Sequence, residues 1–565
     1  MNIYKKLTAL AAASALLFTL TPAAKAPETK ILHADAAAPD EYHDDWLHVN
    51  ENAEIVDMYG NPVWLTGCNW FGYNVTTQCF DGVWSRNMHE MLNEMADHGF
   101  NLMRVPMSTQ ILLQWKNHDP DPYMVKINEW KNPELTVEGV QGGTPKYSFD
   151  IWNMAVQWCR ENGIKIMIDI HCATTASNGH QLPLWYDSNY STDDWLEALS
   201  WFAEYYKDDD TVIAIDLKNE PHGKNDGQGM AIWDDSTAEN NWKYAAERGA
   251  AAVLEQNPNL LIMVEGNEVY PKFENGKDWN SPAVDYAHYD DPSAQAFHGA
   301  WWGGNFRGAR DFPVDLGEYQ SQLVYSPHDY GPLVWEQEWF KKDFTRQTLL
   351  DDYWYDSWAY LIEENISPLL MGEWGGFIDE EHDPTGDNKK WMQILRDYMI
   401  EKRIHHTFWC FNENSGDTGG LLTNDFQDWD VEKYEFVKPA LWQTEDGKFI
   451  SLDHKIPLGQ SGNGISLTEY YSGSAPDPDP DPDDKPTYGD TDCDGTIYLN
   501  DVILVMQAVG NPDMYGIGGT SEAALTEAGM TNADVYDPGT GLTNQDALTI
   551  QKYLLNLIDK LPVNS

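Results

Sequence analysis

Short apolar runs that stop at polar side chains recur along residues 45–456 of the chain. The run at residues 212–221, VIAIDLKNEP, begins with Val, Ile, Ala and Ile and stops at Asn219, Glu220 and Pro221. A nearly continuous, largely β-branched run of this kind is typical of a strand buried on both faces in a parallel sheet. Proline has no amide hydrogen to donate to a neighbouring strand, so we expect the strand to end here.

Further runs of the same type predict one strand each. They are residues 63–70, 100–107, 165–172, 260–266, 323–330, 367–373 and 406–412. Apolar residues at helical spacing lie between most of these runs, as at residues 88–95 and 149–162. Alternating strands and helices are typical of α/β proteins, and we expect a (β/α)8 TIM barrel over residues 45–456. An open doubly wound sheet is the alternative fold.

Two of the predicted strands end in a glutamate. Glu220 closes the run at 212–221, and Glu373 closes the run SPLLMGE at 367–373. Barrel enzymes carry their catalytic side chains at the carboxyl ends of the strands, and two carboxylates are the minimum equipment for cleaving a glycosidic bond. Either glutamate alone could be a surface salt bridge or a helix cap, and Glu265 at the tip of the fifth strand is a rival. The pair at two strand ends favours catalysis.

Other polar and aromatic side chains follow the same strands. Arg104 lies near the end of the second strand, where a guanidinium needs a carboxylate partner. His171 follows the third strand, and a single histidine in such a place is more often a structural hydrogen-bonding residue than a catalyst. Trp302 lies in a glycine-rich connection that could bind sugar rings or pack on the barrel rim. The other candidates near the barrel mouth are Trp70, Asn219, His328, Tyr330 and Trp409.

Composition narrows the class of partner. The 25 Trp, 29 Tyr and 18 Phe residues make 13% of the chain aromatic, and flat rings are the surfaces on which sugar rings stack. The 36 basic and 91 acidic residues give a formal charge of -55, which argues against nucleic acid or an anionic membrane as a partner. We therefore expect a neutral polymer as substrate, handled by a monomeric enzyme.

The amino terminus has the pattern of a secretory signal. Lys5 and Lys6 precede an apolar run at 7–20, and Ala24-x-Ala26 follows. We expect a signal peptide at 1–26 and a secreted, extracellular protein, with a second candidate cleavage site at Ala34-x-Ala36. The 6 cysteines include no Cys-x-x-Cys pair and predict neither a disulfide scaffold nor a zinc site; one or two disulfides and free buried thiols are both open.

The carboxyl-terminal part of the chain changes character at a Pro and Asp repeat. Residues 472–487 contain the sequence APDPDPDPDD, which should stay extended as a spacer. Beyond it, residues 490–501 (DTDCDGTIYLND) have acidic residues at positions 1, 3, 5 and 12 and glycine at 6, the pattern of an EF-hand calcium loop. The expected ligands are the side chains of Asp490, Asp492, Asp494 and Asp501 and the carbonyl of Thr496.

A degenerate second loop follows at 534–546. It has one extra residue, and its candidate ligands are Asp534, Asp537 and Asp546, with Tyr536 where a ligand would be expected. Each loop precedes an apolar helix pattern, at 502–509 and 547–557. We expect a small all-α, calcium-binding domain over 488–562, built from a duplicated loop and helix, with two Ca²⁺ sites.

The barrel part resembles glycoside hydrolase family five, the cellulase-type barrels. The resemblance covers roughly residues 45–456 and rests on four motifs in order: NWFG at 69–72, NEPH at 219–222, WWGGN at 301–305 and SGDTGG at 415–420. It implies a retaining, endoglucanase-like hydrolase of β-1,4-glucan that needs no cofactor for catalysis. It implies that Glu220 is the acid/base, Glu373 the nucleophile, Asn219 the 2-hydroxyl binder and Trp409 a stacking platform. Arg104, His171, His328 and Tyr330 match the remaining active-site positions of the family.

Residues 488–562 are similar to type I-like dockerins. The resemblance implies that this module binds a cohesin domain on the scaffoldin of a cellulosome. Three alternatives remain open for the whole chain: a barrel that acts from chain ends, a barrel that cleaves mannan or xyloglucan, and a non-catalytic sugar-binding component of the same assembly.

Overall fold

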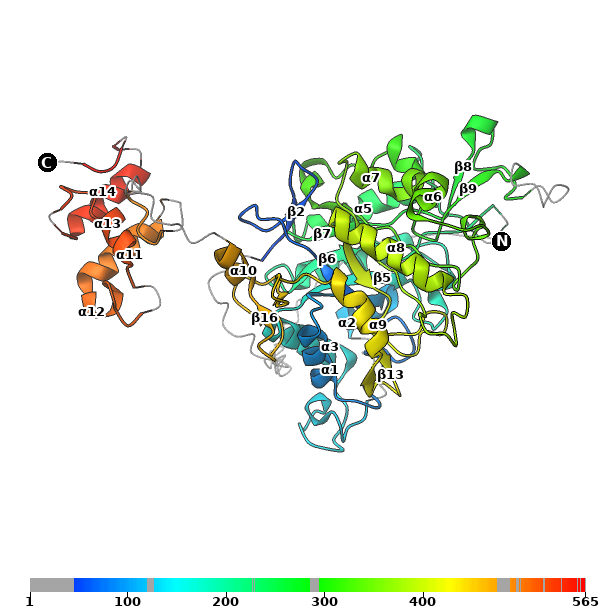
Figure 1. Cartoon of the computed structure of the whole chain (residues 1–565), viewed down its shortest axis with the longest axis horizontal. Helices are drawn as coiled ribbons and strands as arrows, with labels where there is room; N and C mark the ends of the chain where they lie inside the picture. The colour runs from blue at the N-terminus through cyan, green and yellow to red at the C-terminus, as the bar shows by residue number, and fades with distance from the viewer. Residues whose placement is uncertain are drawn as a thin grey trace, which may run out of the picture. The chain divides into compact units, whose positions relative to one another are not determined.

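The computed structural model of the chain describes residues 45–118, 127–284, 294–474 and 488–563. Within these ranges it leaves out residues 226, 228, 494–496, 498, 522, 523, 540, 556 and 559. The chain divides between Ser472 and Gly473 into two compact units, which are drawn from blue to yellow and from orange to red in Figure 1. The expected signal peptide at 1–26 and nearly all of the expected linker at 472–487 lie outside the described residues.

The first unit is built around a parallel eight-stranded sheet. Its order is β10-β7-β6-β5-β4-β3-β12-β11. The strands are β3 (Thr66–Asn69), β4 (Leu102–Ser108), β5 (Lys165–Cys172), β6 (Val212–Asp216), β7 (Leu261–Val264), β10 (Leu323–Tyr325), β11 (Leu370–Met371) and β12 (His405–Phe408). Parallel bridges from Tyr325 to Leu369 and from His328 to Glu373 join the two edges. The sheet is thus a near-closed barrel, which confirms the predicted TIM-barrel architecture and rules out the open sheet.

Alternation along the strands separates the core from the site. On β5, Ile166, Ile168 and Ile170 belong to the large apolar cluster that includes residues of the outer helices, whereas Met167 belongs to a second apolar cluster. Side chains of a strand alternate between its two faces, so Asp169 shares the inner face with Met167, two residues nearer the carboxyl end. Apolar residues therefore fill the lower barrel, and charged residues occupy the layer above them.

Helices surround the barrel in all but one of its repeats. They are α1 (Met88–Asp97), α3 (Ser148–Glu161), α4 (Thr192–Tyr205), α5 (Trp242–Leu254), the continuous α6 (Arg346–Leu349), η9 (Leu350–Ala359) and α7 (Tyr360–Glu363), α8 (Asp387–Lys402) and α9 (Val431–Val437). The ten-residue η9 is a π-helix. Between β7 and β10 the described residues form no α-helix, so the expectation of eight strand-helix alternations is wrong for the fifth repeat. The hairpin of β8 (Val269–Pro271) and β9 (Phe297–Gly299) and short 3-10 turns stand there instead.

Shorter elements decorate the barrel unit. They are β1 (His48–Val49), β2 (Ile55–Val56), α2 (Thr109–Asn117), β13 (Leu422–Thr423), β14 (Asp428–Trp429), β15 (Phe449–Ile450), β16 (Gly464–Ile465), α10 (Leu467–Ser474) and the 3-10 turns η1 (Pro133–Leu135), η2 (Gly179–Gln181), η3 (Phe273–Asn275), η6 (Arg307–Arg310), η7 (Gly317–Gln322), η8 (Glu338–Phe340) and η10 (Lys438–Ala440). Leu458 and Leu467 are buried in the barrel's apolar clusters. The barrel unit therefore extends beyond the expected boundary at 456.

The second unit is helical over its described residues. It contains α11 (Leu499–Gly510), α12 (Pro512–Tyr515), α13 (Glu527–Ala533) and α14 (Asn544–Leu554). The two longer helices, α11 and α14, pack against each other around Val505 and Ile550. Among the described helices of both units, none combines the length and apolar character needed to span a membrane.

Candidate active site

The barrel closes where the two predicted catalytic glutamates meet. The loop after β6 carries Glu220, and the segment after β11 carries Glu373. Three atoms lie within 4.8 Å of one another: a carboxylate oxygen of Glu220, a carboxylate oxygen of Glu373 and a ring nitrogen of His328. Glu373 is almost fully buried, and the side chain of Glu220 is 12% exposed. The fold therefore brings together two acids that are 153 positions apart in the sequence.

Arg104 is the cationic centre of the layer beneath them. It lies on β4 and is fully buried. Its Nη1 donates to Oε1 of Glu373 at 2.9 Å, and its Nη2 donates to Oδ2 of Asp216 at 2.9 Å and to Oδ1 of Asn219 at 3.1 Å. Burial alone would lower the pKa of Arg104, but the surrounding carboxylates, Asp169 first, raise it well above its usual value. Arg104 is thus a permanent cation, as expected from the sequence.

Glu373 receives two hydrogen bonds that favour its ionised form. One comes from Arg104, and the other comes from the hydroxyl of Tyr330, 2.6 Å from Oε2. Burial raises the pKa of Glu373, His328 and Arg104 oppose the rise, and Glu220 adds to it. Neither the guanidinium nor the phenol gives up its proton readily. Glu373 is therefore oriented by fixed donors, as a nucleophile requires.

Glu220 is held differently. Its backbone adopts the left-handed conformation, with φ at 50°, and its amide donates to Oε2 of Glu265 at 2.7 Å. Its Oε1 lies 3.1 Å from Nδ1 of His328. Burial opposes the ionised form, but the hydrogen bond and charge of His328 lower the pKa of Glu220 to about 2. The partner of the Glu220 carboxyl is therefore a group that can itself gain or lose a proton.

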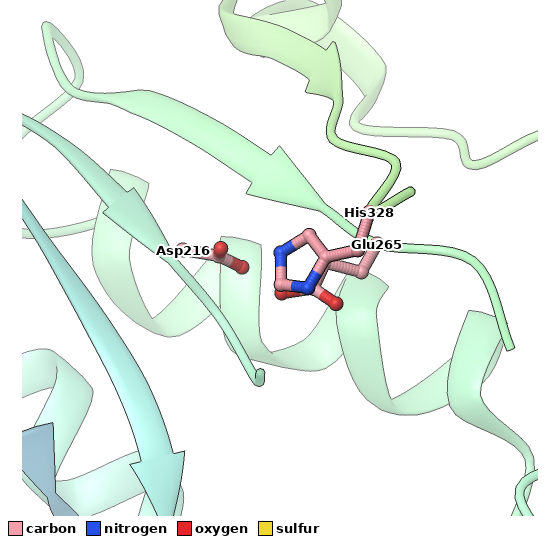
Figure 2. Close-up of side chains that lie close together, drawn as sticks. All are labelled: Asp216, Glu265 and His328. Carbon is pink, nitrogen blue, oxygen red and sulfur yellow. The ribbon is translucent and has the colours of Figure 1, made fainter. Parts of the chain in front are cut away.

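His328 bridges two carboxyl groups. Its Nδ1 faces Glu220, and its Nε2 lies 3.2 Å from Oε1 of Glu265. Figure 2 shows its ring beside the carboxyl of Glu265, with Asp216 facing both from β6. Burial alone would lower the pKa of His328, but Glu265, Glu373 and Glu220 together raise it well above its usual value. The three carboxyl groups thus favour the protonated, cationic form of this imidazole.

The side-chain amide of Asn219 is hydrogen-bonded through its oxygen but not through its nitrogen among the described residues. Its Oδ1 accepts from Arg104, whereas its buried Nδ2 has no hydrogen-bond partner among the described residues. A buried donor without a partner is costly, so it favours a ligand that supplies an acceptor.

His171 and Trp409 form one wall of the site. Nδ1 of His171 lies 2.7 Å from Oδ2 of Asp169, and its ring stacks on Trp409 with centroids 5.7 Å apart. Burial, together with nearby Arg104, lowers the pKa of His171 to about 3. Trp409 is half-buried, and its Nε1 donates to Ser415 at 3.1 Å. A neutral, fixed His171 fits the structural role that the sequence favoured over proton transfer.

The two other tryptophans differ. Trp302 is half-buried and stacks on His222 with centroids 3.8 Å apart, while Nδ1 of His222 lies 2.7 Å from the carbonyl oxygen of Glu220. Trp302 is therefore next to the Glu220 loop. Trp70 is fully buried and stacks on Phe80. The expectation that Trp70 contacts substrate is corrected by this packing, because its ring lies in the core.

The comparisons with known proteins agree with this geometry. Residues 56–415 match the model of the family described as Cellulase (glycosyl hydrolase family 5). The chain belongs to this family. It is 50% identical to Endoglucanase G of Acetivibrio thermocellus over 84% of this chain and 87% of that protein, and 43% identical to Endoglucanase B of the same organism over 84% and 86%. An endocellulase of Pyrococcus horikoshii, solved in complex with cellotetraose, has a TM-score of 0.58 and 31% identity over 70% of this chain and 98% of that one.

As a family 5 glycosidase, the chain carries acids that sequence reasoning missed or misplaced. Asp169 and Asp216 lie within β5 and β6 and contact Arg104, whereas the sequence pattern predicts functional residues only where the apolar runs stop. An aspartate inside an otherwise apolar strand was the available signal, because a buried charge requires a partner. Glu265, the rival carboxylate at the tip of the fifth strand, is fully buried and accepts the amide of Glu220. Asn69 also supports the site, accepting from Nη1 of Arg104 at 2.9 Å.

The second unit of this glycosidase repeats one loop geometry. Oδ1 of Asp501 accepts from the amide of Thr491 at 2.5 Å and from that of Asp492 at 3.3 Å. Oδ1 of Asp546 accepts from the amides of residues 535 and 536, both at 2.9 Å. The fourth residue of each loop, Cys493 or Asp537, is left-handed. Asp537 therefore occupies the position of Cys493, and Tyr536 that of Asp492, so the candidate ligand Asp537 has no counterpart among the expected ligands of the first loop.

The first of these loops has the donors for a hard cation. One carboxylate oxygen from each of Asp490, Asp492 and Asp501 lies within 4.8 Å of the others. The expected ligands Asp494 and Thr496 lie outside the described residues. In the second loop, Oδ1 of Asp534 is buried without a hydrogen-bond partner among the described residues. Clustered carboxylates and an orphaned buried oxygen fit Ca²⁺, which binds six to eight oxygens.

Proposed function

We propose that this glycosidase is a retaining β-1,4-glucan hydrolase that cleaves within chains. The observation that carries the proposal is the approach of Glu220 and Glu373 to within 4.8 Å, oxygen to oxygen. Retaining glycosidases hold their two carboxyl groups about 5–5.5 Å apart, whereas inverting ones need about 6.5–9.5 Å to admit a water. The endoglucanase relatives favour β-1,4-glucan as substrate and internal cleavage.

Glu373 attacks the anomeric carbon in the first step. Arg104 and Tyr330 hold its carboxylate in place for the attack. The protonated form of Glu220 gives its proton to the glycosidic oxygen as the bond to the leaving sugar breaks. The product is a covalent ester between Glu373 and the sugar, with inverted configuration.

Water releases the sugar in the second step. Ionised Glu220 takes a proton from the water, which attacks the anomeric carbon and displaces Glu373. The second inversion restores the original configuration. Nδ2 of Asn219 supplies a hydrogen bond to the 2-hydroxyl that strengthens as the ring flattens, so it lowers the barrier rather than only binding the substrate. No metal takes part in either step.

The test replaces each glutamate by alanine. Both Glu220→Ala and Glu373→Ala should lose at least about 10³-fold in kcat on soluble glucan, while the exposed Glu318→Ala control keeps wild-type activity. Azide should restore turnover in both variants, giving the β-glycosyl azide with Glu220→Ala and the α-glycosyl azide with Glu373→Ala. Equal activity of all three variants would contradict an enzymatic barrel and favour a non-catalytic sugar-binding component.

Substrate and mode of action have their own assay. Initial rates on β-1,4-glucan should exceed those on mannan and xyloglucan, and the viscosity of a soluble glucan should fall well before reducing ends accumulate. Early release of cellobiose without loss of viscosity would favour action from chain ends.

We propose in addition that the second unit is a calcium-binding dockerin and that the protein is secreted and joined to a cellulosome scaffoldin. The duplicated loops, the carboxylate cluster and the orphaned oxygen of Asp534 support the calcium sites. The signal pattern at 1–26 supports export. Asp490, Asp492 and Asp501 would hold the first ion, and Asp534 and Asp546 would contribute to the second. Bound Ca²⁺ would fix the loops and thereby the packing of α11 on α14.

Calorimetry on the full chain tests this module. Ca²⁺ should bind with two equivalents in the wild type and with one in Asp490→Ala/Asp492→Ala. A purified cohesin should bind the Ca²⁺-loaded chain and not the chelated one. Retention of cohesin binding after chelation would contradict calcium-dependent docking.

A further inference from the structure

Both oxygens of Glu265 are engaged by the catalytic machinery, although Glu265 itself is fully buried. Oε2 accepts the amide of Glu220 at 2.7 Å, and Oε1 lies 3.2 Å from Nε2 of His328 and 3.2 Å from Nη2 of Arg104. A side chain in this place cannot touch a sugar. It contacts the acid/base through the backbone and through an imidazole.

The backbone contact acts on an unusual conformation. Glu220 has a φ of 50°, a region that residues with a Cβ seldom occupy without support from their surroundings. The carboxylate of Glu265 provides that support, because a charge-assisted hydrogen bond to an amide is stronger than a neutral one. Glu265 thereby fixes the direction in which the Glu220 side chain leaves the chain.

The imidazole contact forms a line of three groups. His328 has Glu265 at its Nε2 and Glu220 at its Nδ1, as Figure 2 shows for the Glu265 side. Nδ1 is hydrogen-bonded to Glu220, whereas Nε2 has no hydrogen-bond partner among the described residues and meets Oε1 of Glu265 as an ion pair. The ring orientation is thus set from the side away from the substrate.

Gly303 lies directly against the carboxylate of Glu265. A Cβ on Gly303 would overlap Oε2 of Glu265, so only glycine lets the WWGG segment cover the carboxylate. The carbonyl of Gly303 accepts from the amide of Gly266 at 2.8 Å, which fastens this segment to the residue after Glu265. The glycine motif therefore serves a buried acid rather than a sugar contact at this position.

We propose that Glu265 is the positioning residue of the acid/base: it fixes the backbone of Glu220 and holds His328 as the store of the proton that Glu220 delivers. The inference rests on the proposed function, in which Glu220 is the acid/base. In the first step the proton on Nδ1 of His328 moves to Oε1 of Glu220 across 3.1 Å, and Glu220 protonates the glycosidic oxygen. His328 is left neutral, with its remaining proton on Nε2 toward Glu265. When water is deprotonated in the second step, the proton returns through Glu220 to Nδ1.

Several charged groups face the line of three. Asp169, Asp216 and Glu373 also face His328, and Lys218 and Arg104 face Glu265. Burial disfavours the ionised form of Glu265 and raises its pKa well above its usual value, whereas His328 and Arg104, each 3.2 Å from Oε1, favour that form. Removing the negative charge of Glu265 would weaken the hold of His328 on its proton.

The experiment compares Glu265→Gln with a matched control. Glu268→Gln makes the same change three residues on, where Glu268 binds the amide of Gly223 at 2.9 Å and the ammonium of Lys224 at 2.8 Å. For Glu265→Gln, kcat/KM should fall about 10- to 100-fold on an unactivated glucan but less than about 3-fold on dinitrophenyl cellobioside, whose leaving group needs no acid. The alkaline limb of its pH profile should also move to lower pH. Glu268→Gln should match the wild type within about 3-fold on both substrates.

The outcomes separate this inference from the proposed function. An inactive Glu220→Ala beside a wild-type-like Glu265→Gln overturns the inference alone, whereas an active Glu220→Ala overturns the proposed function. Equal losses on both substrates, with an unmoved alkaline limb, indicate a purely structural residue and also overturn the inference. If Glu265→Gln does not fold, Glu265→Asp takes its place, because it keeps the charge beside Arg104 but shortens the reach to Glu220. The same result is expected of it, a larger loss on the unactivated glucan than on dinitrophenyl cellobioside.

Discussion

Tyr330 tests the electrostatics of the nucleophile at the scale of one hydroxyl. Its OH lies 2.6 Å from Oε2 of Glu373 and favours the ionised carboxylate. In Tyr330→Phe the pKa of Glu373, which burial already raises, should rise further. Because Glu373 must be ionised to attack, the acidic limb of the kcat/KM profile should move to higher pH. At neutral pH kcat should fall about 10- to 100-fold, the equivalent of a charged hydrogen bond worth about 1.5–3 kcal/mol.

The control for Tyr330 lies outside the barrel mouth. The hydroxyl of Tyr434 donates to the carbonyl of His98 at 3.0 Å, so Tyr434→Phe loses a hydrogen bond of similar kind without touching Glu373. Its pH profile should match that of the wild type. An unmoved acidic limb in Tyr330→Phe would show that the hydroxyl does not stabilise the carboxylate.

Single residues were predictable where chemistry coincides with a strand end. Glu220 and Glu373 stand where an apolar run stops, and Arg104 had to find a carboxylate partner. Asp169 and Asp216 stand inside runs that read as core, and their meeting at Arg104 depends on the curvature of the closed sheet. The prediction that Trp70 contacts substrate is wrong because an aromatic side chain at a strand end can turn into the core as easily as toward a ligand.

At the scale of elements, the segment after residue 456 is part of the barrel. Strand β15 pairs with β16, and Leu467 at the start of α10 is fully buried. Leu467→Ala should lower the free energy of unfolding by about 2–5 kcal/mol, the usual cost of a buried leucine. Chemical denaturation of the barrel unit measures this. The exposed Val431→Ala should cost less than about 1 kcal/mol. Equal stability of both variants would show that the segment is dispensable.

Elements were predictable in proportion to the regularity of their pattern. Strand β5 has the predicted bounds, because its apolar run is long. The fifth repeat failed because its connection is rich in glycine and aromatic residues, which carry no helical periodicity. The π-helix η9 is not distinguishable from an α-helix by sequence, since the apolar spacing of ten residues does not separate i+4 from i+5 hydrogen bonding. The sequence does not indicate that the barrel unit continues past residue 456, because β15 and β16 are only two residues long each.

At the scale of the whole barrel unit, Lys165 ties its two ends together. Its Nζ lies 2.6 Å from Oδ2 of Asp45, near the start of the described chain, and 3.3 Å from Oδ2 of Asp453, near the end of the unit. All three residues are buried. Lys165→Met should cost about 3–5 kcal/mol at pH 7, because it leaves buried carboxylates without their cation.

This deficit should depend on pH in a defined direction. Burial opposes ionisation of Asp45, but Lys165 and His454 lower its pKa below the unfolded value of 3.8. Such a group stabilises the fold above the unfolded pKa, and the contribution is lost as pH falls below it. The difference in Tm between wild type and Lys165→Met should therefore be constant from pH 7 to 5 and shrink below about pH 4. Lys116→Met, which breaks an exposed pair with Glu197, should change Tm little at any pH.

The two units should also respond separately to calcium. The carboxylate cluster of Asp490, Asp492 and Asp501 lies in the second unit, whereas the carboxylates of the catalytic site contact Arg104 and His328 in the first. Chelation of Ca²⁺ should therefore remove the thermal transition of the second unit, since the like charges of these carboxylates would then repel one another, and leave the transition of the barrel in place. Hydrolysis of soluble glucan should change by less than about 2-fold, because Ca²⁺ stabilises only the unit that binds it, and the catalytic residues lie in the other unit. A parallel loss of glucan hydrolysis would mean that the barrel depends on the ion, and that Arg104 and His328 do not suffice as buried counter-charges to Glu373.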